Sequence, residues 1–208
     1  MRITYMSEVK IIPIVEGHGE CSATPILIRR IASDIFPDFV PQILYPIRIP
    51  ASRLLKAGEI ERAVALASYK VNGVGGIFIL LDGDFKDCCP AINGPELRAR
   101  AQATRSDIPI SVVLAKMEYE AWFLAAAESL RGKRGLPETL EPPPNPENIR
   151  GAKEWLSDHM PEGQRYIETT DQPAFTKLFD MTTARKNSDS FDKCYRDIEK
   201  MLRGLRVS

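Results

Sequence analysis

The chain has 208 residues with 28 basic and 28 acidic side chains, so its formal charge is zero. This length suits one domain with an appendage, and the balanced charge gives no uniform attraction to nucleic acid. No apolar stretch approaches the roughly 20 residues that span a bilayer, and no signal-peptide core stands at the start, so we expect a cytoplasmic protein without a membrane partner. The four cysteines lack C-x-x-C spacing, which argues against a disulfide framework and a structural zinc.

The first part of the chain begins with a short apolar run over residues 10–15, which predicts a strand. The pair Thr24-Pro25 predicts the start of a helix, with the threonine as its N-cap. A short strand is expected over residues 42–48, and a longer helix from Ser52 onward. This segment therefore reads as strand, helix, strand and helix.

The clearest strand of the chain is predicted over residues 75–82, where five large apolar residues stand in a row. Such a run is typical of a central strand that is covered on both faces. A helix over 95–105, a strand over 109–115 and a helix over 121–127 follow. Strands that alternate with helices predict an α/β fold with a mainly parallel sheet flanked by helices.

The composition changes after these elements. Residues 137–146 contain five prolines and predict an extended connector rather than a helix. A short helix is expected over 151–159, and apolar residues at helical spacing predict a final amphipathic helix over 191–205 with Ser190 as its cap.

These patterns divide the chain into two parts. Residues 1–132 are predicted to form an α/β domain, and residues 133–208 a proline-rich connector with a small helical C-terminal extension. The second part is too small for a core of its own. We therefore expect it to pack on the sheet.

Acidic side chains follow three of the predicted strands. They are Glu16 and Glu20, Asp82 and Asp84, and Glu118 and Glu120. Because the carboxyl ends of parallel strands share one edge of the sheet, we expect these carboxylates to converge. Like charges held close repel unless a cation neutralises them or some are protonated. Hard oxygen ligands in this number favour magnesium or manganese over zinc.

The alternative is that each acid only begins a helix, where the helix dipole favours negative charge. For Glu118 and Glu120 the two interpretations are balanced, and one of the two would then cap the helix that contains Trp122. We interpret His18 as a hydrogen-bonding neighbour of the acids rather than a ligand. Trp122 and Phe123 are expected to be core anchors.

Three segments resemble a known group of proteins. Val15-Glu-Gly-His-Gly-Glu20 on a first strand and Leu81-Asp-Gly-Asp84 on a later one resemble the Toprim catalytic fold of topoisomerases, bacterial primases and OLD-type nucleases. Glu118-Tyr-Glu-Ala-Trp-Phe-Leu-Ala125 resembles a narrower group, the Toprim-like bacterial proteins of unknown function called DUF4276. The resemblance covers about residues 9–127.

This resemblance implies a Toprim-like, Rossmann-like sheet and assigns roles to its acids. In Toprim enzymes the first-strand glutamate is a general acid/base and metal ligand, which here is Glu16. The Asp-x-Asp pair binds magnesium and corresponds to Asp82 and Asp84, while Glu20 matches the second glutamate of the OLD-like pattern. The chain departs from some relatives at Phe85, where they have a basic residue.

From these observations we expect a Mg²⁺- or Mn²⁺-dependent enzyme that cleaves phosphodiesters, a Toprim-like nuclease acting on nucleic acid or nucleotides. Glu16 and Glu20 would be its catalytic residues, and one or the other would orient the attacking water while Asp82 and Asp84 hold the metal. A topoisomerase is disfavoured because the sequence shows no large DNA-gating domain. The alternative from a different class is a non-catalytic or partner-activated subunit of a bacterial defence-type system. It would bind nucleic acid or nucleotide and act beside an ATPase as partner protein.

Overall fold

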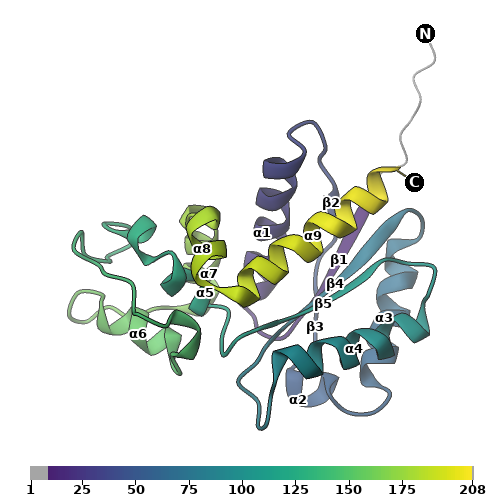
Figure 1. The fold of residues 1–208 in the computed structure, drawn as a ribbon, viewed down its shortest axis with the longest axis horizontal. Helices are drawn as coiled ribbons and strands as arrows, with labels where there is room; N and C mark the ends of the chain where they lie inside the picture. The colour runs from purple at the N-terminus through teal and green to yellow at the C-terminus, as the bar shows by residue number, and fades with distance from the viewer. Residues whose placement is uncertain (1–8, 208) are drawn as a thin grey trace.

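A single parallel β-sheet organises the chain (Figure 1). The computed structural model describes residues 9–207. Its strands are β1 (Lys10–Val15), β2 (Gln42–Ile43), β3 (Ile47–Arg48), β4 (Gly75–Asp82) and β5 (Ile110–Ala115). The order across the sheet is β2-β1-β4-β5, and β3 also pairs with β1. All of these pairings are parallel, which confirms the predicted α/β class with a Rossmann-like parallel sheet.

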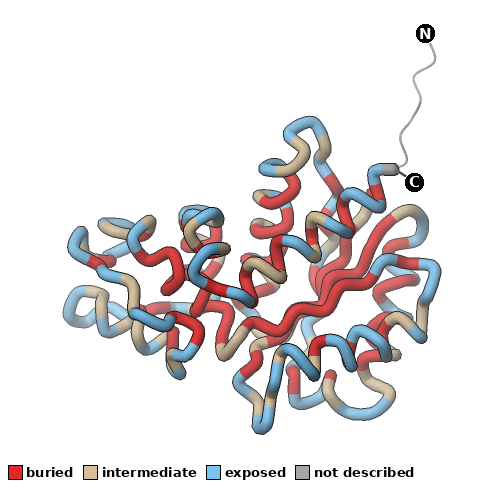
Figure 2. Tube along the Cα trace, in the orientation of Figure 1, coloured by how far each residue is buried: buried red, intermediate tan, exposed pale blue. Residues whose placement is uncertain are grey.

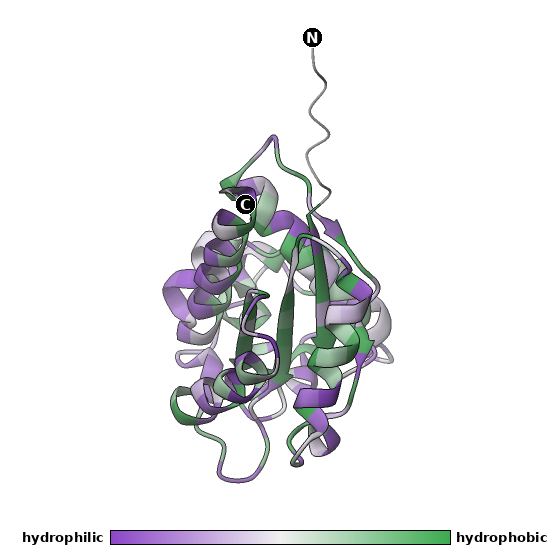
Figure 3. Cartoon of the chain, turned by 90° about the vertical axis from the view of Figure 1, so that its right-hand side faces the viewer, coloured by the Kyte–Doolittle hydropathy of each residue, from purple (hydrophilic) through white to green (hydrophobic). Residues whose placement is uncertain are grey.

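Helices cover both faces of the sheet. They are α1 (Glu20–Ile35) and α9 (Asp189–Val207) on one face, and α2 (Ala51–Leu54), α3 (Glu59–Val71) and α4 (Pro90–Thr104) on the other. Successive strand residues point to opposite faces, so Phe78 packs in the core under α1 and α9 while Ile77 packs in the core under α3 and α4. The three longer strands β1, β4 and β5 are therefore almost entirely buried (Figure 2), and they lie between the helices (Figure 3).

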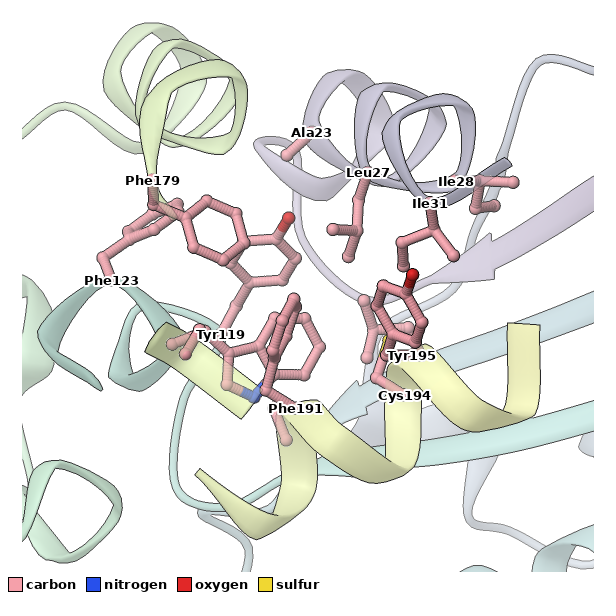
Figure 4. Packing of buried hydrophobic residues seen from close by; sticks show 14 of the residues in the cluster. Ala23, Leu27, Ile28, Ile31, Tyr119, Phe123, Phe179, Phe191, Cys194 and Tyr195 are labelled. Carbon is pink, nitrogen blue, oxygen red and sulfur yellow. The ribbon is translucent and has the colours of Figure 1, made fainter. Parts of the chain in front are cut away.

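The remaining helices gather at the end of the sheet where the strands finish (Figure 1). They are α5 (Ala121–Ala125), the 3-10 helices η1 (Ala127–Leu130) and η2 (Pro146–Asn148), α6 (Ala152–Asp158), α7 (Glu168–Leu178) and α8 (Met181–Asn187). Aromatic rings join this group to α9 (Figure 4). The ring centroids of Trp122 and Phe191 are 5.3 Å apart, and those of Phe123 and Phe179 are 5.5 Å apart. Trp122 and Phe123 are fully buried, as predicted for core anchors.

Several element boundaries differ from the sequence prediction. Helix α1 begins at Glu20 rather than at Thr24, because the Gly19 carbonyl already accepts hydrogen bonds from the next turn. The single strand predicted over 42–48 is two short strands, since Pro46 has no N–H to continue the ladder. The helix predicted from Ser52 is divided into α2 and α3 at Gly58, whose φ is 80°.

The C-terminal part contains more helix than the sequence predicted. Helices α7 and α8 were not expected, and α4 begins at Pro90 rather than at Pro95. Ser188 caps α9 by accepting the Phe191 N–H at 3.0 Å, so Ser190 is not the cap. Ser190 accepts the indole N–H of Trp122 at 2.9 Å instead.

The hydrophobic core under α1 and α9 contains residues from both predicted parts of the chain. Phe78 of β4 and Leu202 of α9 belong to the same cluster of buried side chains. The boundary predicted at residue 132 remains a prediction. In the range that the structure describes, no helix is long and apolar enough to cross a membrane.

Candidate acidic site at the carboxyl ends of the strands

Glu16 and Asp82 meet because their strands are neighbours. β1 and β4 pair in parallel with Ile14 opposite Ile79, so both acids lie just beyond the paired residues. The Asp82 backbone N–H donates a hydrogen bond to Glu16 Oε2 at 3.3 Å. Burial raises the pKa of Glu16, and so do the nearby carboxylates of Glu20 and Asp84, although backbone N–H groups oppose the shift.

Asp82 lies at the centre of the acidic group. Its Oδ1 accepts the Tyr119 backbone N–H at 2.8 Å, which ties the loop after β5 to the end of β4. Burial raises the pKa of Asp82 well above its usual range, and the carboxylates of Glu120, Glu20 and Glu16 raise it further. Four carboxylates thus lie close enough to repel one another.

Asp84 stands at the exposed side of this group. It is exposed, and its charge contributes to the raised pKa of Glu16. The Gly83 N–H between the two aspartates donates to the carbonyls of Ala115 at 2.8 Å and Met117 at 2.9 Å. A Cβ on Gly83 would lie 2.7 Å from the Ala115 carbonyl, so this turn requires glycine.

Glu20 is linked to Glu120 by an amide from α7. The Gly17 N–H donates to Glu20 Oε2. Gln172 Nε2 donates to Glu20 Oε1 and to Glu120 Oε1, both at 3.1 Å. The Gln172 side chain is fully buried, and its Oε1 has no hydrogen-bond partner among the described residues. Its approach requires glycine at position 19, where a Cβ would lie 2.3 Å from Gln172 Oε1.

Glu120 is fully buried among groups from the C-terminal part of the chain. Its Oε1 also accepts the Tyr166 hydroxyl at 2.8 Å. Its Oε2 accepts no hydrogen bond from the described residues, and Lys153 Nζ is 4.0 Å away. Burial is the largest effect on this carboxyl and raises its pKa to about 7, although Lys153 lowers it.

Lys153 on α6 supplies positive charge to the acidic group. Its Nζ is 3.5 Å from Glu168 Oε2, and Glu168 Oε1 accepts the Gly19 N–H at 2.9 Å. Burial alone would lower the pKa of Lys153, but the carboxylates of Glu120, Asp82 and Glu168 raise it on balance. Glu168 is therefore a further acid of this site.

Glu118 has a different position from the other predicted acids. Its Oε1 accepts the backbone N–H of Gly151 at 2.9 Å and that of Ala152 at 3.2 Å. It therefore satisfies donors at the start of α6, whereas the alternative considered for this residue was a cap of the Trp122 helix α5, which has no side-chain cap hydrogen bond. The structure thus groups Asp82 with four of the other five predicted acids, while Glu118 holds α6.

The donor set suits a hard cation, but the ligands are not assembled. Carboxylate oxygens from Glu16, Asp82 and Asp84 are the type that Mg²⁺ and Mn²⁺ prefer, and the buried Glu120 Oε2 has no hydrogen bond. In residues 9–207, no group of three His, Cys, Asp or Glu side chains is arranged to hold a metal ion as it stands. Side-chain rotation at the strand ends would have to complete such a site.

The sequence reasoning missed four contributors to the site. They are Lys153, Tyr166, Glu168 and Gln172, all from the C-terminal part. Strand ends can be recognised from apolar runs, whereas these residues lie on or beside helices whose position depends on packing. Gly19 was the one local sign of this contact, because only a residue without a side chain leaves room for Glu168 and Gln172 of α7.

The comparisons identify a family for the chain. A family model described as a domain of unknown function, DUF4276, matches residues 15–199. No curated protein and no solved structure matches the sequence significantly. The match extends through the C-terminal helices, beyond the segments that carried the resemblance. The chain therefore belongs to the DUF4276 family.

Proposed function

We propose that this chain is a Mg²⁺- or Mn²⁺-dependent phosphodiester-cleaving enzyme, a Toprim-like nuclease that acts on nucleic acid. One observation carries the proposal: Glu16 and Asp82, which are 66 residues apart, lie in hydrogen-bond contact at the ends of adjacent central strands. Ligand sites of open α/β sheets lie at this edge. Raised carboxyl pKa values in one cluster are typical of functional sites.

The residues of the cluster divide into two roles. Asp82 and Asp84 would hold the ion together with Glu16, and a bound Mg²⁺ or Mn²⁺ would supply charge stabilisation and a more acidic water. Glu16 or Glu20 would orient the attacking water, and Glu16 would accept its proton. The raised pKa of Glu16 suits a general base, because such a base works best with a pKa near the operating pH.

The experiment that tests this proposal compares two Asp-to-Asn variants. We expect wild-type protein to cleave DNA or RNA with Mg²⁺ or Mn²⁺ and to lose at least about a hundredfold in rate in Asp82→Asn. The side-chain carbonyl of the new asparagine keeps an acceptor for the Tyr119 N–H, so the fold should persist. Asp87→Asn is the matched control, since Asp87 is exposed and asparagine tolerates its positive φ of 58°. Equal cleavage by wild type and Asp82→Asn would refute the assignment.

A second candidate function is a subunit that binds nucleic acid or nucleotide without turnover, or that cleaves only when a partner ATPase activates it. The hydrogen bonds from Gln172 to Glu20 and Glu120 favour this candidate, because they hold two acids away from an assembled metal site. In the same experiment, metal-dependent binding without cleavage by the wild type would support it. Cleavage by the isolated wild type would exclude it.

A further inference from the structure

We propose that the ammonium of Lys153 neutralises the carboxylates in one half of the acidic site, where a second metal ion would otherwise bind. The site therefore takes one divalent ion rather than two. The inner half consists of Glu20, Glu120 and Glu168, and the outer half of Glu16, Asp82 and Asp84. In this proposal the ion belongs to the outer half and the lysine to the inner half. The inference deepens the proposed function and rests on its metal ion.

Most carboxylate oxygens of the inner half already accept hydrogen bonds. Glu20 Oε2 accepts the Gly17 N–H, and Glu20 Oε1 accepts the Gln172 amide. Glu120 Oε1 accepts both the Gln172 amide and the Tyr166 hydroxyl. The amide therefore presents its N–H₂ to these acids, and a metal ion placed between them would meet donors instead of ligand oxygens.

The oxygens that remain in the inner half face Lys153. Its Nζ is 4.0 Å from Glu120 Oε2 and 3.5 Å from Glu168 Oε2, while the other Glu168 oxygen accepts the Gly19 N–H. Glu120 Oε2 is buried and accepts no hydrogen bond from the described residues. Among those residues, the Lys153 ammonium is the only cation that forms an ion pair with it. A divalent ion at the same oxygens would be repelled by the lysine at close range.

The outer half keeps oxygens available for an ion. Asp82 Oδ1 accepts the Tyr119 N–H, whereas its Oδ2 accepts no hydrogen bond from residues 9–207. Asp84 is exposed, and the hydrogen bond from the Asp82 N–H to Glu16 Oε2 is a long one of 3.3 Å. The exposed Asp84 therefore opens this half to solvent on one side, and the Asp82 oxygen without a hydrogen bond can take an ion without losing a donor.

The fold fixes the lysine in this place. Lys153 lies in the first turn of α6, and Glu118 accepts the backbone N–H groups of Gly151 and Ala152 at the start of that helix. Glu118 therefore holds α6, and with it the lysine, against the loop after β5. This gives Glu118 a positioning role rather than a place among the ligands.

Counting bound Mn²⁺ by electron paramagnetic resonance, with thermal unfolding in parallel, tests the proposal on the full chain. We expect one ion per wild-type chain and two per Lys153→Met chain, because the methionine keeps an unbranched apolar stem and removes the charge. Lys177→Met is the matched control, since Lys177 is exposed on α7, and it should bind one ion. In EDTA the melting temperature of Lys153→Met should fall by several degrees, and Mn²⁺ should restore it more than it raises that of the wild type.

The possible outcomes separate this inference from the proposed function. Two ions in the wild type, or one ion in a folded Lys153→Met chain, would overturn the role of Lys153 and leave the nuclease proposal intact. No ion in the wild type would overturn the metal-dependent function itself. If Lys153→Met does not fold, Lys153→Gln also removes the charge and should bind two ions, whereas Lys153→Arg keeps the charge and should bind one; one ion in folded Lys153→Gln would overturn the role of Lys153.

Discussion

Glu120 shows how burial and charge act on a single residue of this site. Its side chain has no exposed surface, yet it is ionisable and lies near the carboxylates of Glu20 and Asp82. Tyr166 and Gln172 both donate hydrogen bonds to Glu120 Oε1. A neutral oxygen at the same position would accept these two hydrogen bonds as well. The carboxyl pKa of about 7 therefore makes the charge of the site sensitive to pH near neutrality.

This pKa predicts how stability depends on pH. Folded Glu120 binds its proton more tightly than the unfolded chain, so its contribution is complete below the ordinary value of 4.5 and is lost as pH rises through about 7. The shift corresponds to about 3 kcal/mol. We expect the free energy of unfolding to fall between about pH 5 and pH 8 in EDTA, and to fall less in Glu120→Gln. Urea unfolding at each pH measures this, and parallel curves for the two proteins would contradict it.

Among single residues, the sequence predicted those site residues that lie at the ends of strands. Glu16 and Asp82 follow apolar runs, and parallel strands bring such ends together. Lys153 and Gln172 could not be predicted, because nothing in their local sequence indicates which part of the sheet their helices face. Glu118 and Glu120 were balanced between two interpretations, and the structure gives them different surroundings: one holds α6 and the other is buried in the acidic group.

Among the secondary-structure elements, α5 and α9 are joined by a buried polar contact. The Trp122 indole N–H donates to Ser190 Oγ at 2.9 Å, and the Lys116 backbone N–H donates to the same oxygen at 3.2 Å. Trp122 is fully buried, so its N–H has no access to water. This serine therefore connects α9 with the loop after β5 that carries Tyr119 and Glu120.

The two hydrogen bonds to Ser190 predict how much stability is lost when this serine is replaced. We expect Ser190→Ala to lower the free energy of unfolding by about 1–3 kcal/mol, because a buried donor is left without its acceptor. Ser52→Ala is the control: Ser52 is exposed, and its change should stay within about 0.5 kcal/mol. Chemical unfolding of both variants gives the comparison. A Ser190→Ala protein as stable as the Ser52→Ala protein would show that the contact contributes nothing.

Element by element, the sequence predicted the long strands best and the C-terminal helices least. The run from Ile77 to Leu81 has no polar residue and is a central strand. Helix α7 contains Pro173, and its buried side chains include polar ones such as Asp171 and Gln172. An apolar pattern at helical spacing is therefore weak there, because the helix packs partly against the acidic site rather than the core.

Across the whole molecule, the C-terminal part completes the core of the sheet. Ile198 and Leu202 of α9 share one cluster with Phe78 and Leu80 of β4. Helix α7 contacts α1 as well, so both ends of the chain contribute to the same face. The parallel sheet was predictable from alternating strands and helices. The large contribution of the C-terminal helices to this core was not predictable. A helical pattern shows which face of a helix is apolar, but it does not show which part of the protein covers that face.

This sharing predicts that residues 1–132 do not fold on their own. Without α9, one face of β4 and β5 would be exposed to water, and Trp122 and Tyr119 would lose the groups that satisfy their buried polar atoms. We expect the fragment to lack near-ultraviolet circular dichroism and a cooperative urea transition, both of which the full chain should show. A cooperative transition of the fragment at the midpoint of the full chain would establish an independent domain.

The place of α6 and α7 beside the strand ends also sets when the acidic site can be completed in a cell. Asp82 leaves the ribosome well before Gln172 does, and at about 5–20 residues per second the delay is on the order of ten seconds. During that interval the emerging polypeptide carries the acids without the groups that hydrogen-bond to Glu20 and Glu120 in the folded chain, Gln172 and Tyr166. The contacts that hold Glu20 and Glu120 in the folded chain are therefore made only after both strands that carry Glu16 and Asp82 have been synthesised.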